Sequence, residues 1–158
     1  MTENTQNQAN QPQVLLQKIY LKDASIEIPS APGIFTKNEQ PSVDIAIATN
    51  VQNLGDNNYH VVLSVTVTGK LQNKETAFLV EAHQAGIFSI SGFANVEDVE
   101  AVLGTFCPNT LFPFARETIA DFIQRAGFPP ILLQPVNFDA LYLEHRNRDA
   151  EQAAAVTH

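Results

Sequence analysis

Histidine, cysteine and clustered carboxylates are the side chains of this chain that could bind a metal or catalyse a reaction. The chain carries His60, His83, His145 and His158, one cysteine at position 107, and the acidic residues Glu97, Asp98 and Glu100. No two histidines stand four residues apart, and none has a cysteine partner at the spacing of a zinc site. The acidic residues follow Asn95, which indicates a capped helix N-terminus whose dipole they face. No metal site is predicted.

The sequence contains neither a clear catalytic nucleophile nor a nucleotide-binding loop. Cys107 lies between an aromatic residue and a proline, where a free cysteine is expected to be a small buried hydrophobe. The Gly69-Lys70 pair lacks the glycine that a phosphate-binding loop needs five residues earlier, because that position is Ser64. A hairpin turn is the better interpretation. We therefore expect no enzyme, no cofactor and no use of ATP by this chain.

Four segments have the alternating pattern of β-strands. They are residues 17–28, 43–51, 59–68 and 76–90. Turn residues separate the last three segments, and a bulge or bend is expected at Ala85-Gly86 within the long fourth one. Short turns between strands favour antiparallel pairing. Val43, Ile45 and Ile47 then share one face of the second strand, and that face is either a binding surface or the core beneath the helices.

Helical patterns follow the strands, which predicts the α+β class. A short helix is expected after Asn95, and a longer one from Leu111 to Ala126 with one apolar face and a stop at Gly127. The next stretch, Phe128 to Val136, holds three prolines and large apolar side chains, so it can be neither helix nor sheet interior. It is either a lid on the core or one wall of an apolar groove. Asn137 caps a last helix.

Composition bounds the class of protein. The 158 residues are 44% hydrophobic and 16% charged, as is usual for a globular protein of one domain. We expect that domain at 14–148, between a disordered tail at 1–13 and a flexible tail at 149–158. The N-terminus lacks the features of a secretory signal, and no apolar run approaches the ~20 residues of a membrane span. A cytoplasmic protein without direct membrane insertion is expected. The net charge of −8 argues against nucleic acid and favours basic partners.

Several unusual strings identify a family. The run CPNTLFPFARE at 107–117, then GFP at 127–129 and PVNFDALY at 135–142, resembles the SecB family of bacterial protein-export chaperones. Residues 19–23, 76–81 and 85–90 resemble its first and fourth strands, so the likeness runs in order from about Val14 to Tyr142. One departure is the absence of any tryptophan, which family members often carry near Glu39.

The resemblance implies a fold and a function. The fold would be a four-stranded antiparallel sheet with the C-terminal helices packed on one face, assembled as a dimer of dimers, a homotetramer. The function would be that of an ATP-independent holdase, which binds unfolded preproteins in apolar grooves and delivers them to SecA, the motor ATPase of the Sec translocase. The alternative is a small-molecule or peptide binding module of the same class, which should have convergent polar groups in its cleft. The sequence offers no such groups.

The resemblance also assigns residues to three surfaces. Client binding is expected at Ile26, Val43, Ile45, Ile47, Phe88, Leu132 and Val136. SecA docking is expected at Asp23, Glu27, Leu79 and Glu81, and contacts between subunits at Val80, Ala82 and Gln84. Spacing alone places Asp23 with Glu27, and Leu79 with Glu81, on one face of their strands. From spacing alone, that face would be an ordinary solvated sheet surface, and only the family likeness makes it a docking surface.

Overall fold

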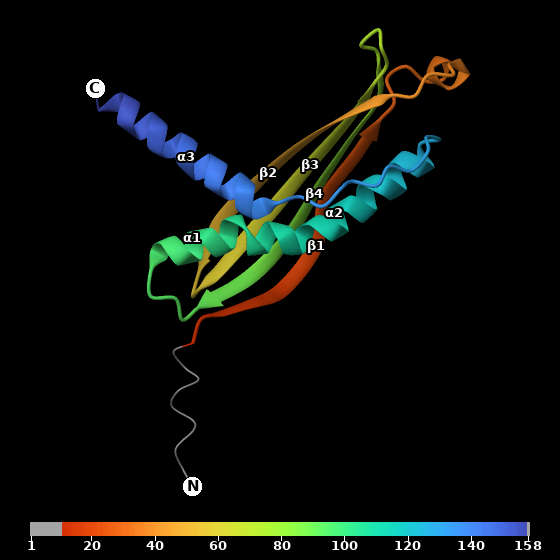
Figure 1. Ribbon diagram of the computed structural model, residues 1–158. Helices are drawn as coiled ribbons and strands as arrows, with labels where there is room; N and C mark the ends of the chain where they lie inside the picture. Colours follow the sequence, from red (N-terminus) through yellow and green to blue (C-terminus); the bar gives the residue numbers. More distant parts are fainter. Residues whose placement is uncertain (1–10, 158) are drawn as a thin grey trace.

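The computed structural model describes residues 11–157, and its elements form a sheet covered on one face by helices (Figure 1). The strands are β1 (Gln13–Glu27), β2 (Ser42–Gly55), β3 (Asn58–Lys70) and β4 (Thr76–Ser91), with a short 3-10 helix η1 (Gly33–Thr36) between the first two. The helices α1 (Val96–Gly104), α2 (Phe106–Arg125) and α3 (Phe138–Val156) follow. The strands pair antiparallel in the order β1-β4-β3-β2. The expected α+β class and antiparallel sheet are confirmed.

The turn between β2 and β3 sets the register of that hairpin. Asp56 and Asn57 both have positive φ, 52° and 63°, as a two-residue hairpin turn with the right twist requires. Gly55 and Asn58 pair across it, and beyond one extra residue, Leu54, the ladder runs without a further shift, with Ile45 opposite Val67. Residues directly opposite each other project to the same face. The turn and this extra residue together fix the face of each β2 side chain that precedes Leu54.

The core lies between α2 and one face of the sheet, called here the covered face. Strand β3 contributes every second residue to it, from Val61 to Val67, and all of these are fully buried. Helix α2 contributes Leu111, Ala115 and Ile119, the apolar face predicted from their spacing. Cys107 is fully buried beside them, as expected for a small hydrophobe. The opposite face of the sheet, called here the open face, carries the alternate residues.

The register shifts of the sheet lie within β1, at the end of β2 and at the end of the β3–β4 ladder, and none lies at the predicted Ala85-Gly86 position. The β1–β4 pairing shifts between Leu16 and Lys18, and again between Leu21 and Asp23, whereas β4 pairs with β3 without a break at Gly86. The glycine is needed for a different reason, since a Cβ at Gly86 would lie 3.0 Å from the Phe88 ring and 3.2 Å from the Lys18 carbonyl oxygen. The prediction of a bulge there is wrong. Gly86 instead lies where a core side chain and the backbone of the neighbouring strand β1 both come close to β4.

The helix boundaries also differ from the expectation. Helix α2 begins at Phe106, ahead of the predicted Leu111, and contains Pro113. Helix α3 continues to Val156, although a tail was expected from position 149, and it projects away from the body (Figure 1). Asn137 caps α3 as predicted, its Oδ1 accepting a hydrogen bond from the Ala140 amide at 3.0 Å. The tail expected at 1–13 lies largely outside the described residues, and Gln13 already belongs to β1.

We expect Gly86→Val to destabilise the protein by about 1–3 kcal/mol, because the added methyl groups overpack a core held by α2 on one side and the β1 backbone on the other. The matched control is Gly33→Val, at a position where a Cβ meets nothing within 4 Å. Urea unfolding of both variants measures the difference, with the slope m as a check on two-state behaviour. Equal midpoints for the two variants would contradict the close-packing argument.

Candidate functional site

The side chains considered for catalysis are separated or inaccessible. Burial raises the pKa of the Cys107 thiol to about 12, so it remains protonated and unreactive at neutral pH. His60 meets Tyr20 on the open face, whereas His145 lies beside Asp149 on the projecting α3. Within residues 11–157, no three His, Cys, Asp or Glu side chains are close enough together to hold a metal ion. The geometry of the described residues points to binding surfaces.

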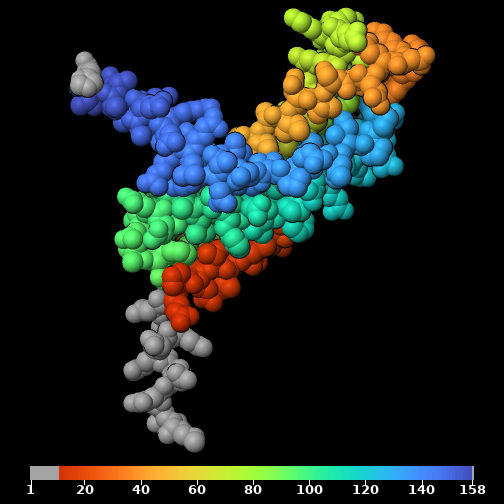
Figure 2. Space-filling view, viewed as in Figure 1, coloured from red at the N-terminus to blue at the C-terminus, as the bar shows by residue number. Residues whose placement is uncertain are grey.

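The connecting segment, residues 128–136 between α2 and α3, serves both of the roles that the sequence left open. It runs back along α2 on the covered side (Figure 2). Leu133 is 2% exposed and belongs to the core, with Ile131 and Val136 packed partly against it. Leu132, its neighbour, is 73% exposed. The segment is therefore a lid through one set of side chains and an apolar surface through the other.

An aromatic cluster continues this surface at one end of the molecule. Phe128 of the connecting segment packs against Phe35 of η1, with ring centroids 5.2 Å apart, and against Phe78 of β4 at 5.0 Å. Phe78 is buried, whereas Phe35 is 49% exposed. The sequence analysis did not single out Phe35. Its position within a loop that holds three prolines was the available signal, because an aromatic residue there must find a partner or stay exposed.

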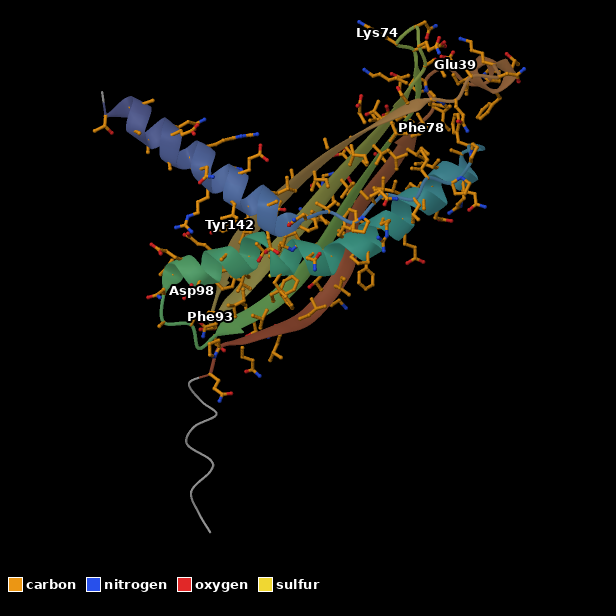
Figure 3. The ribbon with its side chains drawn as sticks, viewed as in Figure 1. Glu39, Lys74, Phe78, Phe93, Asp98 and Tyr142 are labelled. Atoms are coloured by element: carbon orange, nitrogen blue, oxygen red, sulfur yellow. The ribbon has the colours of Figure 1, made fainter. Side chains whose placement is uncertain are left out.

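The loop that carries Phe35 is tied to the turn between β3 and β4. Lys37 forms an ion pair with Glu75, and this lysine holds the pKa of the Glu75 carboxyl below its usual range. Glu39 accepts a hydrogen bond from the Gln72 amide at 2.6 Å. Glu39 and Lys74 lie at the same end of the structure, beyond Phe78 (Figure 3). These polar contacts fix the loop next to the aromatic cluster.

Strand β2 presents an apolar stripe on the covered side, at the edge of the sheet. Ile45 is 49% exposed, and Val43 and Ile47 on either side of it are partly buried against the core. Ile47 also enters a groove of about 720 Å³ between β2, α1 and the first turns of α3. Leu103, Leu141 and Tyr142 line this groove with apolar surface, and charged side chains of α3 line it as well. Figure 3 shows Tyr142 over α1.

Two expected client-binding residues lie elsewhere. Phe88 is fully buried in the core, so its assignment to an accessible groove is wrong in this conformation. Ile26 is partly buried on β1, which is the other edge of the sheet from β2. The remaining expected residues are accessible at least in part. They are Val43, Ile45, Ile47, Leu132 and Val136.

The open face unites the four residues expected to dock a partner. Strands β1 and β4 are neighbours, with Glu27 opposite Leu79 and Ser25 opposite Glu81. Asp23 precedes Ser25 by two residues on β1 and lies opposite His83. We call Asp23, Glu27, Leu79 and Glu81 the docking patch. The adjacency that would bring the two pairs together is confirmed, and the patch combines three carboxylates with one apolar side chain.

The expected subunit contacts alternate with the docking patch along β4 and face the core. Val80 and Ala82 are fully buried and Gln84 is 4% exposed. A second copy of the chain could not touch these side chains without rearrangement of the core. Their assignment as contacts is therefore corrected, because strand alternation turns them to the covered face.

Comparison with known proteins gives a consistent result. The family profile described as preprotein translocase subunit SecB matches residues 7–149. Protein-export protein SecB of Nitrosococcus oceani is 47% identical over 159 residues, which cover 99% of this chain and 96% of that protein. The protein of the same name from Chromobacterium violaceum is 48% identical over 151 residues, with coverage of 96% and 99%.

A solved structure supports the fold. The SecB-like chaperone of Mycobacterium tuberculosis, in complex with a peptide from an antitoxin, matches 78% of this chain and 90% of its own with a TM-score of 0.61. At 18% identity this likeness concerns the fold alone. No helix within residues 11–157 is long and apolar enough to cross a membrane.

Proposed function

This chain belongs to the SecB family of protein-export proteins, chaperones of preprotein translocation, and from that premise we propose that it is a cytoplasmic holdase. It binds unfolded preproteins without ATP and delivers them to the SecA motor of the Sec translocase. The observation that carries the proposal is the identity of close to half of all residues over nearly the whole length of named relatives. The accessible apolar surface described above supplies a physical basis.

Client capture is assigned to the apolar surface on the covered side. Ile45 of β2, Leu132 of the connecting segment and Phe35 of η1 are each about half exposed or more. An unfolded chain that covers them removes apolar area from water at about 25 cal/mol per Å². Since this interaction is non-directional, many sequences can bind. Several such surfaces on one oligomer would hold a long client by effective concentration.

We propose that the oligomer is a homotetramer, a dimer of dimers. The single chain leaves apolar side chains half exposed on β1 and α2, including Leu16, Leu21, Phe106 and Phe114. Helix α3 also projects with little cover. Apolar surface of this kind is expected to be covered by further copies.

We expect a sedimentation mass of four times the 17.3 kDa of one chain at micromolar concentration. Salt should change this mass little, since the exposed residues named are apolar. A mass near that of one chain would contradict the assembly and, with it, the multi-site mechanism of capture.

We expect Leu132→Asp to weaken capture of a reduced, unfolded protein about tenfold while leaving the thermal midpoint little changed, because the side chain is exposed and loses only client contact. Leu133→Asp is the matched control one residue away, and it should lower the midpoint strongly because it buries a charge in the core. Native mass spectrometry measures capture and calorimetry the midpoint. A collapsed midpoint in Leu132→Asp would assign Leu132 to the core and remove it from the client surface.

SecA docking is assigned to the docking patch on the open face. Its three carboxylates suit a basic, zinc-bearing segment of SecA, and Leu79 adds an apolar contact. The client surface lies on the opposite side of the sheet, so a client and SecA can be bound together. Attraction between the patch and a basic segment should weaken with salt over a screening length of about 8 Å at physiological ionic strength.

We expect Glu81→Lys to weaken binding of SecA's C-terminal segment at least tenfold and to leave client capture unchanged, because the two surfaces use different interactions. Glu97→Lys, the same charge reversal on the exposed start of α1, is the control for net charge. Titration calorimetry against the segment and against an unfolded client measures both affinities. Equal loss for both ligands would show that the patch is structural, and unaltered SecA binding would place docking elsewhere.

A further inference from the structure

We propose that His83 is a positioning residue of the docking patch, which holds the Glu81 carboxylate in place and makes the affinity for a basic partner depend on pH. The inference rests on the SecA docking proposed above and deepens it. Its basis is a chain of hydrogen bonds on the open face that links β4 to β3.

The contacts place His83 between a carboxylate and a hydroxyl. Its Nε2 lies 2.8 Å from Oε1 of Glu81, two residues earlier on β4. Its Nδ1 lies 2.9 Å from Oγ of Ser64, the residue directly opposite on β3. The imidazole ring is thus held at both nitrogens, and it fixes one oxygen of Glu81. The side chains of His83 and Glu81 are 29% and 43% exposed, so a partner can reach both.

The neutral ring satisfies all of these contacts at once. With the proton on Nε2, the ring donates to Glu81, and Nδ1 accepts from the Ser64 hydroxyl. Glu81 keeps its full negative charge and its second oxygen for a lysine or arginine of the partner. Protonation of the ring also keeps both contacts, because Nδ1 then donates and the hydroxyl turns to accept. The change is one of charge, with little change of shape.

The groups around His83 determine the sign of the effect. On β4 it faces Glu81, and on β1 Asp23 lies directly opposite, with Lys22 as the extra residue of the neighbouring bulge. On β3 its neighbour Ser64 carries no charge, and Ala48 of β2 lies beyond that serine. A protonated His83 therefore pairs with Glu81 and cancels one of the charges that attract a basic segment. Affinity should be higher where the ring is neutral and fall as the pH is lowered.

The experiment is calorimetric titration of full-length protein with the zinc-loaded C-terminal segment of SecA at pH 8 and pH 6, within the range where histidine side chains change charge. We expect the wild-type affinity to fall about two- to fivefold at pH 6, the effect of one charge a few ångströms from the ligand in water. His83→Gln retains an N–H donor for Glu81 without a titrating ring. It should bind at pH 8 within about twofold of wild type. The ratio of its affinities at pH 8 and pH 6 should be smaller than the wild-type ratio by the same factor of about two to five.

His83→Leu is the second variant, because it removes the donor as well as the charge. It should bind more weakly than His83→Gln at both pH values, since the Glu81 carboxylate is no longer held. Titrating groups of the SecA segment itself act equally on all variants, so only the difference between wild type and His83→Gln is interpreted. Capture of an unfolded client, measured in parallel, should be the same for all three proteins.

Two outcomes would overturn the proposal in different ways. If His83→Gln keeps the full pH dependence of the wild type, His83 does not set the charge of the patch, although docking there stands. If wild type binds the segment at neither pH while it still captures the client, the docking patch itself is wrongly assigned, and the role of His83 falls with it.

Discussion

The packing of α2 on a single face of the sheet is the constraint on which the other features depend. Leu111, Ala115 and Ile119 bury the inward side chains of β3 and β4. Because successive strand residues point to opposite faces, this packing assigns each residue of β4 either to the core or to the open face. Val80 and Ala82 thus belong to the core, while Leu79 and Glu81, which alternate with them, belong to the surface. Strand β4 therefore contributes alternate residues to the hydrophobic core and to the docking patch.

The bulge at Lys22 extends this logic to β1. Strict alternation from Ile19 and Leu21, which face the core side, would send Asp23 to the same side. One extra residue shifts the phase, so that Asp23 and Glu27 reach the open face and Ile26 packs against the core. Two carboxylates that alternation would have directed toward α2 instead join those of β4. The acidic character of the open face therefore depends on an irregularity in the strand that the hydrophobic pattern does not reveal.

The sequence predicted what local pattern determines and missed what depends on neighbouring strands. The strands, the hairpin turn, the apolar face of α2 and the Asn137 cap follow from short-range chemistry, and all are present. Helix α2 begins earlier than predicted because it accommodates Pro108 in its first turn. Backbone N–H groups in the first turn make no hydrogen bond within the helix, so a proline there costs none. The burial of Phe88 and Gln84, and the bulge on β1, depend on pairing register. A single strand's sequence does not contain that information.

The connecting segment shows why the apolar client surface and the core cannot be separated in this fold. Its prolines prevent both a helix and a sheet ladder, so its backbone stays extended and adjacent side chains diverge. Leu133 enters the core as Leu132 leaves it, and Phe128 joins the buried Phe78 to the half-exposed Phe35. The exposed apolar side chains are thereby held on a backbone anchored by buried ones, and less conformational entropy is lost when a client covers them. A surface that must bind many sequences gains from such pre-organisation, since its contacts have no directional hydrogen bonds to add to the affinity.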